Sequence, residues 1–190
     1  MDIKGTQTEK NLLAAFAGES QARNRYSFFS SVARKAGYEQ IAAIFQETAG
    51  NEREHAQRFF DFLQGGDAQI VATYPAGKTN DTAENLRAAA AGERLEWGTL
   101  YPGFSSTAKE EGFTLISTAF REIGEVEEQH EKRYLKLLSN IENGMVFKRD
   151  EPVAWHCRNC GYVHVGKESP IVCPACIHPQ AYCELLAENY

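Results

Sequence analysis

The stretches NEREHAQR (residues 51–58) and EEQHEKRY (residues 127–134) each place a histidine three residues after a glutamate. Side chains three residues apart on a helix lie on the same face, so each Glu-x-x-His motif can offer a carboxylate and an imidazole to one metal ion. A single motif of this kind is most often a solvated stretch of a charged helix. Two copies 75 positions apart, Glu52 with His55 and Glu127 with His130, instead predict a repeated metal-binding helix hairpin.

The repeat extends beyond the two motifs. Ala-Gly-Glu at residues 17–19 returns at residues 91–93, 74 positions later, whereas Gly37 returns as Gly112, 75 positions later. One extra residue must therefore enter the second half between residues 93 and 112. We expect it at Pro102, because proline has no backbone N–H to donate and kinks or bulges a helix. The two halves should form similar hairpins that pack about a pseudo-twofold axis.

Glu19 and Glu93 supply one further carboxylate from each preceding helix. Two glutamates plus two Glu-x-x-His motifs on four helices match the ligand pattern of di-metal carboxylate bundles. Bridging carboxylates offset the repulsion between two cations, and imidazoles fill terminal positions. Glu96 faces the same side as Glu93, but its repeat counterpart is Ala22, so it is either an extra ligand beside one metal or an ordinary exposed glutamate. The candidate ligands are Glu19, Glu52, His55, Glu93, Glu96, Glu127 and His130.

Two tyrosines follow the upstream glutamates at matching positions. Tyr26 and Tyr101 lie about two helical turns beyond Glu19 and Glu93. Either hydroxyl can donate to a ligand carboxylate and hold it in place, or either ring can simply be packed in the core. Both tyrosines and Glu96 are therefore candidates for taking part in chemistry at the metal site.

The cysteines form a second, independent metal motif. Cys157-x-x-Cys160 and Cys173-x-x-Cys176 are separated by twelve residues, and each CxxC turn presents two thiolates to one tetrahedral ion. This spacing does not separate iron from zinc, and a structural zinc ribbon is the more common answer on spacing alone. Cys183 is left over in an apolar stretch and is most simply a packed, reduced thiol.

Apolar residues recur at helical spacing through most of the chain, whereas cysteine, glycine, proline and aromatic residues are frequent near its end. Helices are expected over about residues 6–37, 38–64, 81–112 and 114–143, the first with a possible capping box of Thr6 and Glu9. Residues 65–80 are long for a connection between antiparallel neighbours and suit the crossover of a ferritin-like bundle. Residues 148–152 indicate a polar linker. The expected fold is mainly α, with a ferritin-like four-helix bundle over residues 1–147 and a small β/loop domain over residues 148–190.

Composition narrows the classes of function. The 190 residues are 43% hydrophobic and 24% charged, which is typical of globular domains. The net charge of −6 gives no support for a phosphate-binding surface, so nucleic acid is not an expected partner. No apolar run has the length of a membrane span, and the N-terminus has no signal-peptide pattern, so we expect a cytoplasmic protein with no membrane partner. Cysteines in that compartment favour metal binding over disulfides.

Together these motifs resemble the rubrerythrin family along the whole chain. The matching pieces are AFAGESQARNRY, NEREHAQR, AAAGERLEW, EEQHEKRY, WHCRNCGY and CPACIHP, in that order. The resemblance implies a rubredoxin-like tail and three iron ions per chain, with zinc as a possible substitute. Glu52 and Glu127 would bridge a di-iron site, and Glu96 would exchange with His55 at one iron on reduction. The mononuclear iron would be held by Cys157, Cys160, Cys173 and Cys176.

The same resemblance implies a peroxidase that reduces hydrogen peroxide to water at the di-iron site in defence against oxidative stress. Electrons would arrive one at a time through the four-cysteine iron, from rubredoxin or its reductase and ultimately from NAD(P)H. Members form head-to-tail homodimers, which would place the cysteine centre of one subunit near the di-iron site of the other. The alternatives are a ferritin-type ferroxidase, a zinc ribbon that binds a protein partner, and an oxygenase acting on an organic substrate.

Overall fold

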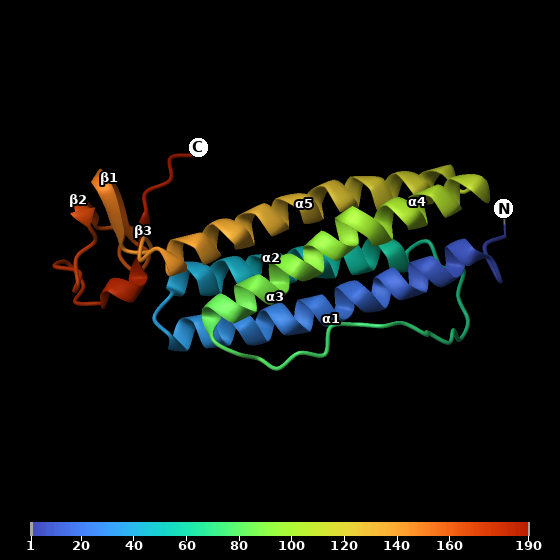
Figure 1. Ribbon diagram of the computed structural model, residues 1–190, viewed down its shortest axis with the longest axis horizontal. Helices are drawn as coiled ribbons and strands as arrows, with labels where there is room; N and C mark the ends of the chain where they lie inside the picture. The colour runs from blue at the N-terminus through green and yellow to red at the C-terminus, as the bar shows by residue number, and fades with distance from the viewer. Residues whose placement is uncertain (1, 190) are drawn as a thin grey trace.

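The computed structural model describes residues 2–189, and within them it consists of a long four-helix bundle with a small sheet at one end (Figure 1). One pair of bundle helices is α1 (Gln7–Lys35) and α2 (Glu39–Phe60). The other pair is α5 (Thr114–Glu142) and an interrupted helix made of α3 (Thr82–Leu95), a π-helix (Glu96–Leu100) and α4 (Tyr101–Glu110). The ferritin-like bundle expected from the repeat is therefore confirmed.

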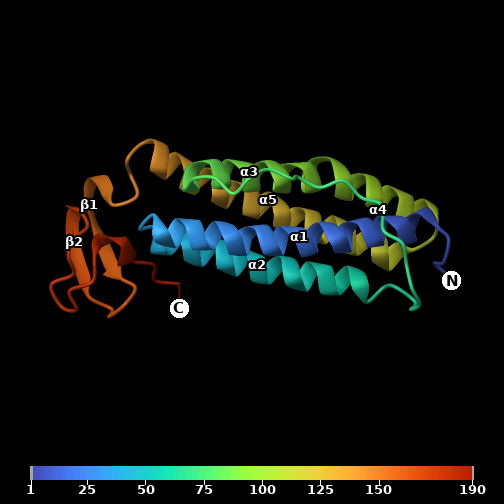
Figure 2. The same cartoon turned by 90° about the horizontal axis from the view of Figure 1, so that it is seen from below.

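Each pair packs as an antiparallel hairpin, and the two hairpins form two layers (Figure 2). Short polar side chains start the helices as expected. Thr6 accepts a hydrogen bond from the Glu9 N–H at 3.1 Å, and Asp81 accepts one from the Glu84 N–H at 2.9 Å. The Glu9 side chain, however, accepts from the N–H of Gly5 rather than of Thr6, so the capping box is shifted by one residue on its return arm.

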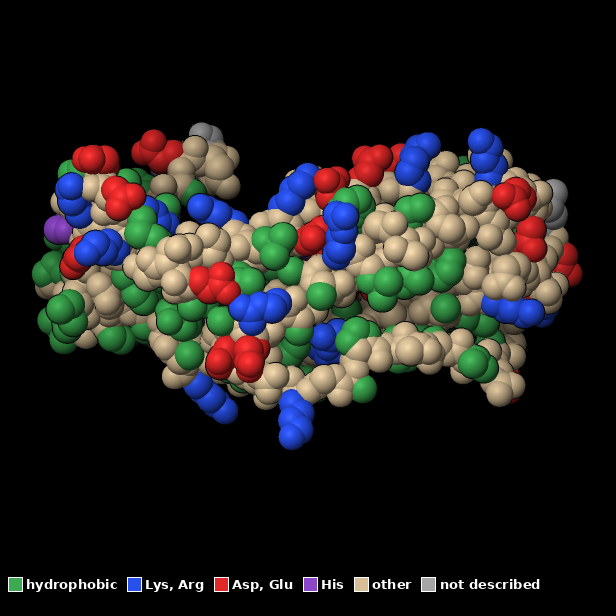
Figure 3. All heavy atoms as spheres, in the orientation of Figure 1, with side chains coloured by type: hydrophobic (Ala, Val, Ile, Leu, Met, Phe, Trp, Pro, Cys, Tyr) green, Lys and Arg blue, Asp and Glu red, His purple; other side chains and the backbone are tan. Residues whose placement is uncertain are grey.

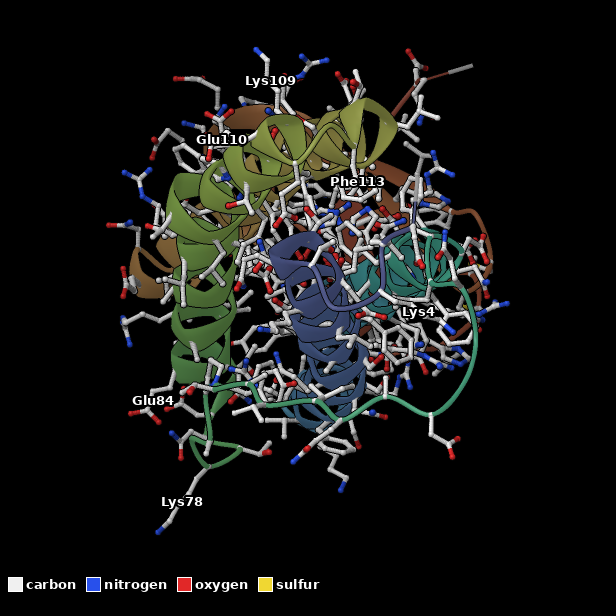
Figure 4. All side chains as sticks on the ribbon, turned by 90° about the vertical axis from the view of Figure 1, so that its right-hand side faces the viewer. Lys4, Lys78, Glu84, Lys109, Glu110 and Phe113 are labelled. Carbon is white, nitrogen blue, oxygen red and sulfur yellow. The ribbon has the colours of Figure 1, made fainter. Side chains whose placement is uncertain are left out.

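The crossover spans residues 65–80 and contains no helix or strand. It runs along the outside of α1 from the end of α2 to the start of α3 (Figure 4), and Lys78 points away from it into solvent. Because it carries the chain back along the whole bundle, α2 and α3 run in the same direction, as the length of the connection predicted. α2 itself ends at Phe60, four residues before the expected end.

The extra residue of the second half lies in the π-helix and not at Pro102. The N–H of Tyr101 bonds to the carbonyl of Glu96, five residues back, which is the hydrogen bond of a π-turn. Pro102 follows directly and has no N–H to restore an α-helical bond to the carbonyl four residues back. The spacing of 75 between Tyr26 and Tyr101 already places the insertion before Tyr101.

Two apolar clusters divide the bundle core. The cluster nearer the sheet includes Tyr26, Phe45 and Tyr134, and the cluster nearer the N-terminus includes Phe59 and Phe120. The acidic residues of the repeat are Glu19, Glu52, Glu93 and Glu127. Along its helix, each of them lies between a residue of one apolar cluster and a residue of the other, so all four lie between the two clusters. The site is therefore held between two packed layers of aromatic side chains.

The C-terminal sheet consists of β1 (Lys148–Cys157), β2 (Val163–Glu168) and β3 (Cys183–Leu185). The strand order is β2-β1-β3, with both pairings antiparallel. Residues 148–152, which composition assigned to a linker, lie instead in β1, and Lys148 pairs with Glu168. Phe147 stacks on Tyr38 with ring centroids 6.1 Å apart, so the sheet rests on the end of the bundle.

Among residues 2–189, no helix combines the length and the apolar character that crossing a membrane requires.

Candidate metal centres

Six of the seven acidic and histidine residues predicted as ligands meet in the middle of the bundle. They form two overlapping groups, and in each group one ligand atom per residue lies within 4.8 Å of every other. Glu52 and Glu127 belong to both groups, which is the arrangement expected of carboxylates shared by two cations. The first group adds Glu19 and His55, and the second adds Glu93 and His130.

Both histidines face the two shared glutamates. His55 Nδ1 is 2.9 Å from Glu52 Oε2 and 2.8 Å from Glu127 Oε1. His130 Nδ1 is 3.2 Å from Glu52 Oε1 and 2.7 Å from Glu127 Oε2. The two halves of the cluster therefore have the same geometry, as the sequence repeat predicts. The imidazole rings are stacked, with an interplanar angle of 27° and centroids 6.0 Å apart.

The polar atoms of the cluster are arranged as ligands of cations rather than as partners in a satisfied hydrogen-bond network. Buried polar atoms in proteins are nearly always hydrogen-bonded, yet several buried atoms here have short neighbours and no hydrogen-bond partner. In each group the ligand atoms lie within 4.8 Å of one another, close enough to share one ion. Carboxylate oxygens and imidazole nitrogens are the ligands of di-iron bundles, so the donor set suits two such ions. The unpartnered atoms are Glu19 Oε2, Glu52 Oε1, Glu93 Oε2, both carboxylate oxygens of Glu127 and His130 Nδ1.

Protons occupy this cluster when cations do not. Burial and the neighbouring carboxylates raise the pKa of Glu19 and of Glu93 well above the ordinary value. Burial alone would lower the pKa of His55, but its contacts with Glu127 and Glu52 outweigh burial and raise that pKa to about 10. The same balance raises the pKa of His130 to about 9. The metal-free cluster is therefore a proton-holding site.

Glu96 is the one candidate ligand that is not among the six converging residues. It is the first residue of the π-helix and belongs to neither group. It is half-buried, and its Oε1 lies 3.8 Å from the position that a Cβ on Gly18 would occupy. Burial, reinforced by the charges of Glu127 and Glu52, raises the pKa of Glu96 to about 8. The structure thus places it beside the cluster, at the edge of a cavity, rather than inside the cluster.

Both tyrosines contact the cluster as the repeat predicts. The Tyr26 hydroxyl donates to Glu93 Oε1 at 2.5 Å, and the Tyr101 hydroxyl donates to Glu19 Oε1. Both rings are fully buried. Each tyrosine therefore bonds the glutamate of the opposite hairpin, which ties the two halves together across the site.

One contact beside the cluster was not predicted from the sequence. Trp97 donates its indole N–H to Glu131 Oε2 at 2.6 Å, and the guanidinium of Arg94 lies over the indole ring at 4.3 Å. Glu131 belongs to neither group of converging ligand atoms. Its partner depends on the turn of the π-helix, which no local pattern around Trp97 indicates.

The four cysteines of the paired CxxC motifs lie together in the C-terminal domain. Their Sγ atoms are all within 4.8 Å of one another, with 3.8 Å between Cys157 and Cys176 and 3.7 Å between Cys160 and Cys173. None of them is in a disulfide. A backbone N–H from His178 lowers the pKa of Cys176 to about 6, which favours the thiolate that a metal needs.

The two cysteine turns are built alike. The N–H of Cys157 bonds to the carbonyl of Tyr162 and the N–H of Cys173 to that of His178, each five residues on. The residue after each turn has a positive φ, +80° at Gly161 and +60° at Ile177. Cys183 lies outside the cluster as a buried free thiol, and its strand pairs it with Cys157.

Comparison with known proteins agrees with both centres. A rubrerythrin family model matches residues 10–138, and a model of the rubredoxin-like domain of rubrerythrin matches residues 155–184. A rubrerythrin of Porphyromonas gingivalis is 62% identical over 188 residues, covering 99% of this chain and 94% of that protein. A rubrerythrin of Nitratidesulfovibrio vulgaris is 55% identical, covering 99% of this chain and 98% of that protein.

Solved structures agree as well. Nigerythrin in a mixed-valence state matches with a TM-score of 0.64 and 30% identity, covering 97% of this chain and 91% of its own. A bacterioferritin of Mycobacterium tuberculosis shares the fold, with a TM-score of 0.64 and 20% identity over 75% of this chain and 90% of its own. The carboxylate–histidine cluster and the four-cysteine cluster are consistent with three iron ions per chain. The chain belongs to the rubrerythrin family, a family of iron-dependent oxidoreductases.

Proposed function

We propose that this protein is a peroxidase that reduces hydrogen peroxide to water at the carboxylate–histidine cluster, with electrons that enter through the four-cysteine centre. The observation that carries the proposal is the presence of both centres in one chain. A ferritin-type ferroxidase, the alternative function, uses the bundle site but needs no separate centre for electron entry. The overall reaction consumes two electrons and two protons for each peroxide and releases two waters.

We assign the ligands by the two groups that the side chains form. Glu19 and His55 would hold one ion, Glu93 and His130 the other, and Glu52 with Glu127 would bridge them. The four cysteines would hold the third ion. When bound, two irons can supply both electrons for an O–O bond together, and a thiolate-bound iron changes oxidation state with little change in geometry.

The surrounding residues would hold the ligands and handle protons. Tyr26 and Tyr101 fix the orientation of Glu93 and Glu19 by donating hydrogen bonds to them. Glu96, with its pKa of about 8, keeps a proton at neutral pH in the metal-free cluster, at the edge of a cavity from which peroxide can arrive. His55 lies in the cluster while Glu96 does not. This arrangement supports the proposal that the two side chains alternate at one iron.

The path for electrons within one chain is long. We propose that the bundle domain ends at residue 147 and that the cysteine domain begins at residue 148. At this boundary Phe147 stacks on Tyr38, just before the first residue of α2, so the cysteine domain lies at that end of the bundle. His55 lies sixteen residues after Glu39, the start of α2, which is about 24 Å along the helix. This separation supports a head-to-tail homodimer in which the cysteine centre of one subunit serves the cluster of the other. A rubredoxin or its reductase, supplied by NAD(P)H, would be the donor to that centre.

A stopped-flow experiment tests the proposal. The protein is reduced without oxygen and mixed with hydrogen peroxide or, separately, with oxygen. The expected result is much faster oxidation of the bundle irons by peroxide, followed by oxidation of the four-cysteine iron, seen as the return of its red colour. Equal rates, or a faster reaction with oxygen, would favour the ferroxidase. A colourless native protein with zinc in the cysteine centre would exclude that centre as the electron entry.

A further inference from the structure

A cavity of about 260 Å³ lies beside Glu96, between α1 and the interrupted third helix of the bundle. Most of its wall is apolar and comes from Ala14, Ala22, Leu95, Leu100 and Phe104. Residues 72–75 of the crossover lie across its outer side. Figure 3 shows hydrophobic side chains gathered on this face of the molecule, next to the crossover.

The cavity is much larger than hydrogen peroxide requires. A water molecule occupies about 30 Å³ in the liquid, so a peroxide needs roughly twice that, whereas an engineered apolar cavity of about 150 Å³ already binds benzene. An apolar wall also favours an apolar ligand, because its burial removes hydrocarbon surface from water. Size and lining together fit an organic group of up to about one aromatic ring.

Polar groups are present at the edge of this apolar space. Gly18 has no side chain, which leaves Oε1 of Glu96 open toward the cavity. Arg25 also lines the cavity, and its Nε is buried with no hydrogen-bond partner. Among the described residues no carboxylate forms an ion pair with Arg25, whose guanidinium lies over the Phe29 ring at 5.5 Å. A ligand with an apolar body and a small oxygen-bearing head would satisfy this donor and this acceptor.

We propose that the cavity binds small organic hydroperoxides, ROOH, with the organic group against the apolar wall and the peroxide oxygens toward Glu96 and Arg25. The inference rests on the peroxidase proposed above and names a second substrate class for the same site. The reaction is ROOH + 2 H⁺ + 2 e⁻ → ROH + H₂O. The O–O bond breaks, each oxygen gains one electron and one proton, and the electrons come from the same one-electron donor protein that serves hydrogen peroxide.

The crossover sets the size limit of the ligand. Every residue from 64 to 81 is exposed except Tyr74, which is half-buried and lines the cavity. Tyr74 therefore covers the cavity from outside. Replacing it by alanine should admit bulkier organic groups, while filling the cavity from α1 should exclude them.

Binding is tested first without turnover. Cumyl alcohol, the product expected from cumene hydroperoxide, is titrated into the oxidised, iron-loaded protein by calorimetry. Ala14→Phe, which fills the cavity, should weaken binding at least tenfold. Ala88→Phe is the matched control, because Ala88 is the repeat counterpart of Ala14 but is exposed on α3 and should leave binding unchanged. No binding to the unaltered protein, or equal effects of both substitutions, would overturn the proposal.

Turnover is then compared for cumene hydroperoxide and hydrogen peroxide, with kcat/KM measured for both. Ala14→Phe should lower kcat/KM for cumene hydroperoxide at least tenfold more than it lowers kcat/KM for hydrogen peroxide. Tyr74→Ala should raise kcat/KM for cumene hydroperoxide and leave kcat/KM for hydrogen peroxide unchanged. Reaction with hydrogen peroxide but not with cumene hydroperoxide would refute this inference and leave the peroxidase intact. If neither peroxide reacts, the peroxidase proposal fails, and calorimetry alone decides whether the cavity binds organic molecules.

Discussion

Tyr101 and Glu19 are joined by a hydrogen bond across the bundle, although they belong to different halves of the sequence repeat. The bond between Tyr26 and Glu93 mirrors it. Each hairpin thus orients a carboxylate of the other, and neither half of the cluster is complete within a single hairpin. This crossed arrangement explains how a repeat of two similar hairpins produces one site and not two.

Removing one of these bonds should destabilise the metal-free protein. Tyr101→Phe leaves Glu19 buried without its donor, which should lower the free energy of unfolding by about 1–3 kcal/mol. The measurement is urea unfolding after chelation. Tyr38→Phe is the matched control, because that ring stacks on Phe147 away from the cluster. Equal stabilities of the two variants would show that the Tyr101 bond contributes nothing.

The two shared glutamates should be essential for both bundle ions. Glu52→Ala or Glu127→Ala removes a carboxylate that belongs to both groups and leaves two cations with one bridge fewer to offset their repulsion. Iron content should fall from three per chain toward one, with the four-cysteine iron retained as an internal standard. Glu54→Ala, at an exposed neighbour of Glu52, should keep all three. Full bundle occupancy in both cluster variants would contradict the ligand assignment.

The raised histidine pKa values predict how pH acts on the metal-free protein. A group whose pKa is higher in the folded state stabilises the protein below its unfolded value, 6.5 for histidine, and that stability is lost as pH rises through the folded value. With folded values of about 10 for His55 and about 9 for His130, stability should fall between pH 6.5 and 10.

Urea midpoints at several pH values across that window test this prediction. The raised pKa values of Glu19 and Glu93 act in the same direction. Metal binding must displace these protons, so loading should release protons at neutral pH and bind more tightly as pH rises. The iron-loaded protein is the control and should show a much flatter pH profile. A metal-free protein whose stability is constant over the window would refute the prediction.

The positive φ of Ile177 should strain the backbone, and a substitution at this position should relieve that strain. A β-branched residue rarely adopts this backbone, and the equivalent place after the first cysteine turn is held by Gly161. Ile177 is 73% exposed, so its side chain contributes little burial. Ile177→Gly should therefore stabilise the domain by about 1 kcal/mol, and Gly161→Ala should destabilise it by a similar amount. Thermal unfolding of the iron-loaded protein measures both effects. A lower melting temperature for Ile177→Gly, or a higher one for Gly161→Ala, would contradict the argument.

The six side chains that converge in the bundle could be predicted from the sequence because their signal is local. Glu52 and His55 share a helix face whatever the rest of the chain does, and the repeat supplies their counterparts. The π-turn that begins at Glu96 was not predicted, because the extra residue of the second half was assigned to Pro102. The spacing of Tyr26 and Tyr101 carried that information.

Tertiary packing decided the features that the sequence left open. The cavity exists only because the crossover lies over α1, and a structureless segment carries no pattern that says where it packs. Residues 148–152 are polar, as a linker would be, but an exposed strand is polar for the same reason. Composition alone does not separate these two environments.

Replacing Glu96 should slow peroxide turnover without emptying the site. Glu96 lies outside both groups of converging atoms, so Glu96→Ala should keep both bundle ions. It lines the cavity from which peroxide is proposed to arrive, where its carboxyl group can pass a proton to the leaving oxygen. Loss of a positioned proton donor typically costs roughly 100-fold or more in rate.

Single-turnover oxidation by hydrogen peroxide, together with iron content, distinguishes the two roles that Glu96 can have. Glu110→Ala, at an exposed position near the end of α4, is the control and should behave as the unaltered protein. If Glu96→Ala loses iron, Glu96 is a required ligand. If it keeps its iron, its rate and its spectra in both oxidation states, Glu96 has no part in the reaction. Retained iron with slow oxidation is the outcome expected of a residue that acts beside the cluster and not within it.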